Sequence, residues 1–142
     1  MLKLNIGSGK HKLEGYVSID IQDCADVVLD LEKDKLPYED NSVDEIAAFH
    51  FFEHINNLLP LVNECNRVLK PGGHLVVAVP NVENIEAFQD PTHVRFFTTT
   101  TWRYWLKDDF YFEECGKGYG ILPFSKMQQD TAGFEIFTRL TK

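Results

Sequence analysis

Basic residues are scarce in this sequence. There are 14 Lys and Arg against 22 Asp and Glu, which gives a formal net charge of −8 and a pI near 5.0. A protein that binds the phosphate backbone of nucleic acids broadly needs a surplus of positive charge. We therefore expect no bulk nucleic acid among the partners.

Cysteine and long apolar runs are also in short supply. Cys24, Cys65 and Cys115 lie far apart and form no C-x-x-C pair, which argues against a disulfide framework and against a thiolate metal site. No apolar stretch approaches the roughly 18 residues that span a bilayer, and the first residues lack the basic-then-apolar pattern of a signal peptide. The composition predicts a cytoplasmic protein that does not enter a membrane.

What the sequence does contain is a series of short apolar runs. With 142 residues, 44% of them hydrophobic, we expect residues 1–142 to form a single domain with a real core. Several runs are apolar on both faces, as central strands of a parallel sheet are. The strands expected in the first part of the chain are Leu2–Ile6, Tyr16–Ile21, Val27–Leu31, Val43–Phe49 and Leu75–Pro80.

One helix is clear from the spacing of its apolar residues. Leu58, Leu61, Val62 and Cys65 recur at helical intervals, and the pattern predicts a helix that starts after Asn57 and ends at the glycines 72–73. A second helix is expected over about residues 100–107. After it, "FYFEE" (110–114) and "FEIFTRL" (134–140) are typical of two more strands, the last of them antiparallel. The predicted fold class is α/β with a mostly parallel sheet and an antiparallel C-terminal strand.

Ligands of such sheets bind outside the carboxyl ends of the strands. The first expected strand ends at Gly7-Ser8-Gly9, where missing side chains let backbone N–H groups approach a ligand. The second ends at Asp20, in a position to accept hydrogen bonds from ribose hydroxyls. Asp30 and Leu31 end the third, and His50 follows the fourth.

Five segments in this order carry a resemblance to a known family. "LNIGSG", "VSIDI", "LDLEKDKLPYEDNSVDEI", "FHFFEHI" and "NECNRVLKPGGHLVVAVPN" together resemble the Rossmann-like class I methyltransferases that use S-adenosylmethionine, especially the short ones of the type 11 group. The similarity covers about residues 2–81. Its most specific parts are "LPYEDNSVDEI" and "RVLKPGG".

The resemblance implies a cofactor site for S-adenosylmethionine. Asn5 stands where the family often has an acidic residue, so recognition of the methionine ammonium is expected to be altered there. The residues implied are Asn5 at the methionine ammonium, Gly7, Ser8 and Gly9 at the methionine part, Asp20 at the ribose, Asp30 and Leu31 beside the adenine, and His50 at the reacting end.

The connections between the first strands are too short for ordinary helices. Only residues 10–15 join the first two strands, whereas a crossover between parallel strands takes about ten to twelve residues or more. Residues 22–26 are also too few, and Pro37 interrupts residues 32–42. One face of the sheet is therefore expected to lack helices and to be covered either by the aromatic C-terminal half or by a second subunit. Of these, we favour a homodimer.

Methyl transfer from a sulfonium needs an acceptor in line with the methyl group, exclusion of water and a base for the acceptor proton. No "NPPY" segment follows the fourth strand, which argues against methylation of the amino group of a nucleobase or of glutamine. The candidate bases are His50 and His93, the latter in "DPTHVRFF" with Asp90 placed to orient its ring. The expected acceptor is a small molecule or a side chain, with O-methylation favoured. The other interpretation of "DPTH" is a turn with an exposed His93.

Three alternative functions fit parts of the sequence. "HFFEH" matches the H-x-x-E-H pattern of zinc hydrolases, with His50 and His54 as ligands and Glu53 as base, but it requires a helix directly after a strand. A nicotinamide-dependent oxidoreductase would need a pyrophosphate site at a helix N-terminus, which the short loop does not supply. A methyltransferase-like binding module without activity is the third. The favoured interpretation includes no metal ligands.

Overall fold

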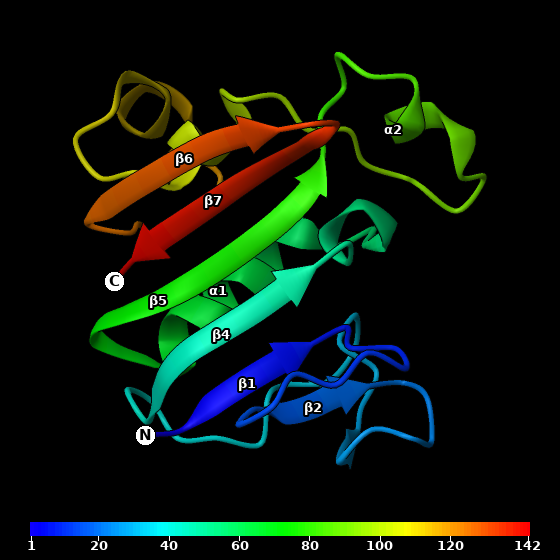
Figure 1. Ribbon diagram of the computed structural model, residues 1–142. Coiled ribbons are helices and arrows are strands. Elements are labelled where there is room, and N and C mark those ends of the chain that lie inside the picture. The colour runs from blue at the N-terminus through cyan, green and yellow to red at the C-terminus, as the bar shows by residue number, and fades with distance from the viewer.

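The computed structural model describes residues 1–142 as one seven-stranded sheet with helices on one side (Figure 1). The strand order is β3-β2-β1-β4-β5-β7-β6. The elements are β1 Lys3–Ile6, β2 Val17–Asp20, β3 Val27–Val28, β4 Val43–Phe49, the short 3₁₀ helix η1 Phe52–His54, α1 Leu58–Val68, β5 Leu69–Pro80, α2 Glu86–Gln89, the 3₁₀ helix η2 Thr101–Trp105, the helical turn η3 Phe112–Gly116, β6 Lys126–Ala132 and β7 Glu135–Thr141.

The sheet is mostly parallel. Strands β1 to β5 run parallel to one another, while β7 is antiparallel to both β5 and β6. The expected fold class is therefore confirmed. β3 pairs over only two residues, because the chain turns at Asp30, whose carbonyl accepts hydrogen bonds from the amides of Lys33 and Asp34. The expected strand over residues 27–31 was too long.

Two predictions for the C-terminal half were wrong. The "FYFEE" segment is helical, since it leads into η3, where Phe112 is 5% exposed and Phe110 points outward. The strand β6 was missed because its sequence, KMQQDTA, has little apolar character. An edge strand with one neighbour does not need a continuous apolar run.

Helix α1 packs its apolar stripe on the back of the sheet in Figure 1. At 11 residues it is the longest helix, and none in this chain is long and apolar enough to cross a membrane. It ends at Val68, short of the glycine pair expected to stop it, because Leu69 is already extended (φ −64°, ψ 137°). Pro71 favours the early end, since proline disfavours helical backbone at Lys70 before it and has no N–H to continue the helical hydrogen bonds.

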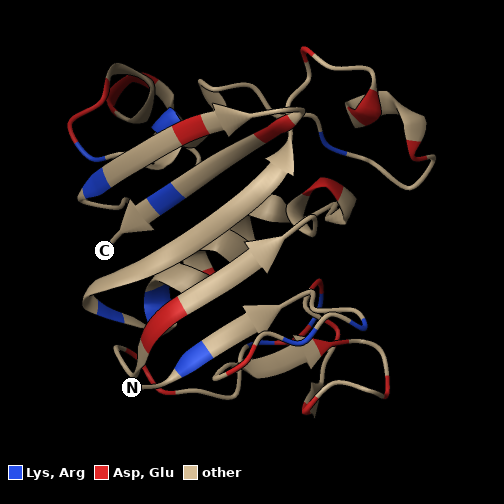
Figure 2. Cartoon of the chain, viewed as in Figure 1, with Lys and Arg blue, Asp and Glu red and all other residues tan.

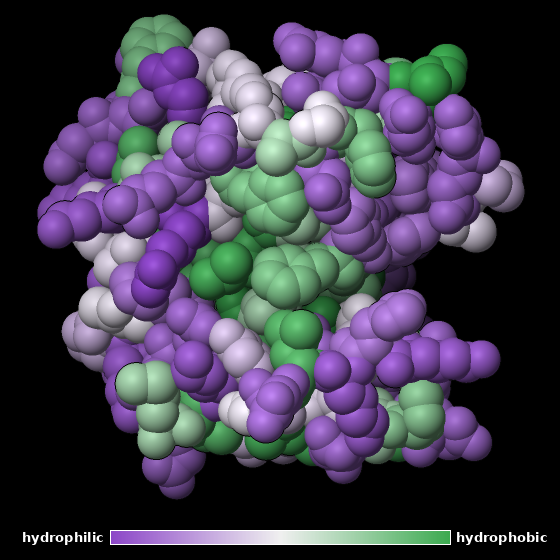
Figure 3. Space-filling model, in the orientation of Figure 1, coloured by the Kyte–Doolittle hydropathy of each residue, from purple (hydrophilic) through white to green (hydrophobic).

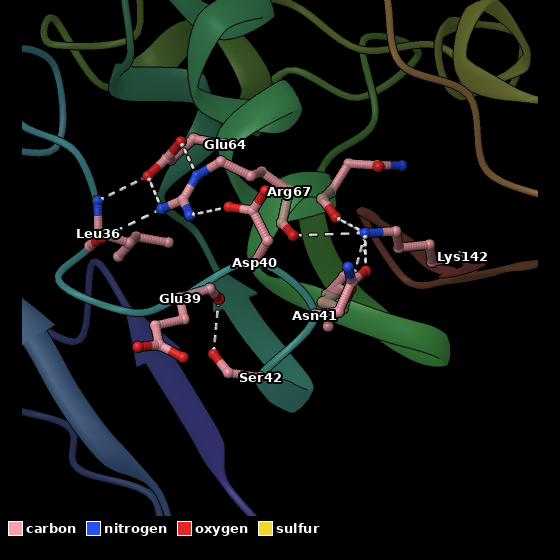
Figure 4. A network of polar contacts seen from close by, with 10 residues as sticks. Leu36, Glu39, Asp40, Asn41, Ser42, Glu64, Arg67 and Lys142 are labelled. Carbon is pink, nitrogen blue, oxygen red and sulfur yellow. Dashed lines mark hydrogen bonds and ion pairs between the residues drawn. The ribbon is translucent and has the colours of Figure 1, made fainter.

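Polar contacts hold the segment that replaces a helix before β4 (Figure 4). The guanidinium of Arg67 bonds to Glu64 and Asp40, and Glu64 accepts the amide of Leu36 at 2.9 Å. At the carboxyl end of α1, Lys142 Nζ donates to the carbonyls of Asn66 (2.6 Å) and Leu69 (2.8 Å). The loop before β4, α1 and the end of β7 are thereby tied together.

The aromatic C-terminal half packs on the same side as α1. Asn63 of α1 donates to the carbonyl of Gly120 and accepts from the amide of Leu122, and Asn66 donates to the carbonyl of Pro123. Trp102 is fully buried and lies 5.7 Å from the ring of Phe52. The alternative in which the aromatic half covers the helix-free face is therefore wrong, because this half extends the layer of α1 instead.

The opposite face of the sheet has no helical cover, as the connection lengths predicted. Cross-strand partners lie on the same side of a sheet, so Ala78, Phe137 and Asp130 share this face, as do Val76 and Arg139. Phe137 is 38% exposed and Phe49 39%. Figure 3 shows an apolar band across the middle of this face. We call this face of the sheet, opposite α1, the open face.

We expect the open face to pair with that of a second copy. Basic Lys126 and Arg139 lie toward one end of β6 and β7, and acidic Asp130 and Glu135 toward the other (Figure 2). A two-fold axis across the strands would place each basic end against an acidic end and cover the apolar band. Sedimentation at micromolar concentration should give about twice the 16.4 kDa of one chain.

In the same experiment Phe137→Asp should give the monomer, since it places a charge in the apolar band. Phe110→Asp is the matched control, because Phe110 is also exposed (65%) but belongs to the aromatic half on the other side. A monomeric unmodified chain at this concentration contradicts the pairing.

Candidate cofactor site

Two hollows lie at the carboxyl ends of the parallel strands. The first has a volume of about 310 Å³ and gathers Asp20, Asp30 and Leu31 with Phe51 and His54. It thus brings together the residues expected at the ribose and the adenine. Asp20 and Asp30 are close in the sequence, and they lie near each other because β2 and β3 are adjacent.

The second hollow, of about 460 Å³, contains the residues expected at the methionine part and the reacting end. They are Asn5, Gly7, Ser8, Gly9 and His50. Gly7 (φ +63°) and Gly9 (φ +51°) both adopt backbone that favours glycine. The ring of Phe51 lies directly on Gly7, so close that a Cβ added there would come within 2.1 Å of it. Because Phe51 lines the first hollow and Gly7 the second, the two hollows adjoin at this contact.

Asp20 shapes the glycine loop, Gly7-Ser8-Gly9, as well as the first hollow. Its carboxylate accepts the amide of Gly9 at 2.8 Å and that of Gln22 at 3.0 Å, and the residue is 9% exposed. A carboxylate has about four acceptor positions, so each oxygen keeps one for a ribose hydroxyl. This second role of Asp20 was not anticipated from the sequence.

Asn5 ties the short loop of residues 10–15 to the open face. Its side-chain amide donates to the carbonyl of His11 at 3.0 Å, and the residue is 3% exposed. The loop occupies the place over β1 that a crossover helix would otherwise take. The amide oxygen of Asn5 keeps its acceptor capacity toward the second hollow, which suits an ammonium group.

His50 lies between two carboxylates. Its Nδ1 is 3.4 Å from Glu53 Oε1, and its Nε2 contacts Glu135 of β7. The Glu53 carboxylate raises the pKa of His50 above its usual value, with a further increase from Glu135, while burial opposes both. His50 also has a left-handed backbone (φ +52°), so no helix joins it to His54. The geometry that the H-x-x-E-H interpretation requires is therefore absent.

His93 and Asp90 lie in the segment after α2. The amide of His93 donates to the carbonyl of Asp90 at 3.2 Å, as the alternative interpretation of "DPTH" as a turn requires. The ring of His93 is nevertheless 8% exposed, and its Nε2 is 3.8 Å from Asp90 Oδ2, beyond hydrogen-bond distance. The Asp90 carboxylate bonds to Thr92 instead. His93 packs edge-on to His54, 4.9 Å between ring centroids.

Comparisons with known proteins agree with this arrangement. Residues 7–77 match the model of a methyltransferase domain family. A probable S-adenosylmethionine-dependent methyltransferase of Mycolicibacterium smegmatis is 45% identical over 47 residues, which cover 33% of this chain and 18% of that protein. The chain covers between 18% and 38% of the curated relatives it matches.

Solved structures share the whole fold at low identity. A methyltransferase from Archaeoglobus fulgidus aligns with a TM-score of 0.70 at 16% identity, over 99% of this chain and 85% of that one. A possible histamine N-methyltransferase from Thermotoga maritima aligns at 0.65 and 16%, over 99% and 82%.

The chain belongs to the methyltransferase domain family, with a class I fold. The family and the fold imply S-adenosylmethionine as its cofactor.

Proposed function

We propose that this chain transfers a methyl group from S-adenosylmethionine to an oxygen of a small molecule or a side chain. The observation that carries the proposal is the meeting of the two hollows at Gly7 and Phe51, with Asp20, Asp30 and Leu31 on one side and the glycine loop and His50 on the other. An elongated cofactor would lie across both hollows. When bound, it supplies an electrophilic methyl carbon on a sulfonium.

The residues of this chain then bind and orient. Asp20 would accept the ribose hydroxyls, Leu31 would pack beside the adenine, and Asn5 would face the ammonium of the methionine part. Phe49 and Phe51 exclude water from the place where the reacting atoms meet, which strengthens the electrostatic interactions there.

We assign removal of the acceptor proton to His50, because it lines the hollow of the glycine loop whereas His93 does not. Contact with Glu135 orients the ring. A raised pKa places the optimum for a general base toward higher pH, since the neutral imidazole is the active form. O-methylation suits this base, because a hydroxyl has a proton to lose.

Calorimetric titration tests the proposal. S-adenosylmethionine and its demethylated product are expected to bind with one site per chain at sub-millimolar concentration, and NAD is expected not to bind, because the loop offers no helix N-terminus for a pyrophosphate. If a folded chain binds neither S-adenosylmethionine nor its demethylated product, the proposal is contradicted.

Transfer to hydroxylated acceptors, followed with a labelled methyl group, tests the second part of the proposal. Cofactor binding without transfer to any acceptor in a broad panel would favour the binding module without activity.

A further inference from the structure

Three side chains converge at η1. Glu53 and His54 come from η1, and His93 comes from the segment after α2. Each offers one ligand atom, and these atoms all lie within 4.8 Å of one another. We propose that Glu53, His54 and His93 form a binding site for a divalent transition-metal ion.

The buried Glu53 is the first argument for an ion. It is 1% exposed, and neither carboxylate oxygen has a hydrogen-bond partner. His50 Nδ1 approaches one oxygen at 3.4 Å without hydrogen-bond geometry. A buried carboxylate without partners is strongly disfavoured, and such groups are as a rule paired or bound to a metal. A cation between Glu53 and the two imidazoles supplies the missing partner.

The backbone fixes the three groups opposite one another. The carbonyl of Glu53 accepts the amides of Val94 (2.8 Å) and Arg95 (3.1 Å), which clamps the segment after α2 to η1. The guanidinium of Arg95 adds a bond from Nε to the carbonyl of Ile55 at 2.7 Å. Arg95 is thus engaged in holding the two segments together, so the site does not depend on flexible surface loops.

Both histidines have one ring nitrogen occupied and the other free. His93 Nδ1 donates to the carbonyl of Ala87 at 2.8 Å, which leaves Nε2 with its lone pair. His54 Nδ1 contacts the hydroxyl (3.0 Å) and carbonyl (3.3 Å) of Thr92, which likewise leaves Nε2. A bond from the outer nitrogen that fixes the tautomer is the arrangement seen around metal-bound imidazoles.

The chemistry of the ligands selects the ion. Two imidazole nitrogens and one carboxylate suit Zn²⁺, Fe²⁺ or Mn²⁺, whereas Ca²⁺ and Mg²⁺ prefer oxygen ligands. Three protein ligands leave coordination positions for water or a substrate oxygen. This set differs from the H-x-x-E-H pattern, because its third ligand is His93 and His50 is outside it.

His54 also lines the first hollow, so the ion would lie at the wall of the cofactor cavity. Binding of the ion does not depend on the proposed methyl transfer, and it can be measured without any cofactor.

The test uses the chain after treatment with a chelator. Calorimetry with Zn²⁺ and Mn²⁺ should give one site per chain, and Co²⁺ should give a visible absorption band of a nitrogen and oxygen environment. Glu53→Gln and His93→Ala should each weaken binding by more than about 100-fold. His74→Ala should leave binding unchanged, since His74 lies in the middle of β5, six residues before its carboxyl end at Pro80, and bonds to Thr141.

Thermal unfolding of the same variants separates loss of the site from loss of the fold. Without metal, Glu53→Gln should melt no lower than the unmodified chain, because it removes a buried charge that has no hydrogen-bond partner. Added Zn²⁺ should raise the melting temperature of the unmodified chain and of His74→Ala only. The proposal is overturned if none of the three transition ions binds, or if Glu53→Gln and His93→Ala bind them as well as His74→Ala does.

Discussion

Asp20→Ala should weaken the binding of S-adenosylmethionine by about 100-fold or more. Two hydrogen bonds from ribose hydroxyls to a carboxylate are each worth about 1.5–3 kcal/mol, and every 1.4 kcal/mol is a factor of about ten in affinity. The variant also frees the amide of Gly9, which the carboxylate holds at 2.8 Å, so the glycine loop loses its support. Both effects act on the same ligand. Calorimetric titration of the variant measures the change in dissociation constant.

Two further variants show whether the carboxylate at this position is responsible. Asp20→Asn keeps an oxygen for the Gly9 amide but turns a donor toward Gln22, and it should fall between Ala and the unmodified chain. Asp23→Ala removes an exposed carboxylate three residues further on and should bind normally. If Asp20→Ala remains folded by circular dichroism and binds as tightly as Asp23→Ala, the assignment of Asp20 to the ribose is wrong.

Gly7→Ala should lower the free energy of unfolding by about 2–6 kcal/mol and weaken cofactor binding with it. A left-handed backbone costs a residue with a side chain about 1–3 kcal/mol, and overpacking adds about 1–3 kcal/mol. The added Cβ would lie 2.1 Å from the ring of Phe51, so the ring must move, and it lies where the two hollows adjoin. Urea unfolding gives the stability, and calorimetry gives the affinity.

Gly133→Ala separates the cost of the left-handed backbone from the cost of overpacking. Gly133 has nearly the same backbone (φ +60°), but nothing lies within 4 Å of an added Cβ. It should lose only the backbone contribution, about 1–3 kcal/mol, and keep its affinity. Gly7→Ala combined with Phe51→Ala should be less destabilised than the sum of the two single changes, because the contact that causes the overlap is gone. Equal losses in Gly7→Ala and Gly133→Ala would mean that Phe51 yields without cost.

The parts of the fold that could be predicted are the elements whose own sequence determines their conformation. The apolar runs predicted β1, β4 and β7 closely, and the short connection over residues 10–15 predicted a face without helices. The polar strand β6 and the aromatic helical turn η3 could not be predicted in this way. Their conformations follow from neighbours far away in the sequence, which outweigh local propensity.

The same division applies to the site. Asp20, Asp30 and the glycine loop follow directly from the rule that ligands bind at the carboxyl ends of parallel strands. The convergence of Glu53 with His93 does not, since 40 residues separate them and their meeting depends on backbone bonds between η1 and the segment after α2. The isolation of Glu53 from hydrogen-bond partners is visible only in the folded chain.

The lysine at the end of α1 also affects the order in which the chain can fold during synthesis. Lys142 is separated by 76 residues from the carbonyl of Asn66 that it caps. On a ribosome, α1 and β5 therefore emerge long before their stabilising partners, and β5 has an unpaired edge until β7 arrives. Such an exposed edge is prone to pairing with other chains. The nascent chain is therefore prone to aggregation until β7 pairs with β5.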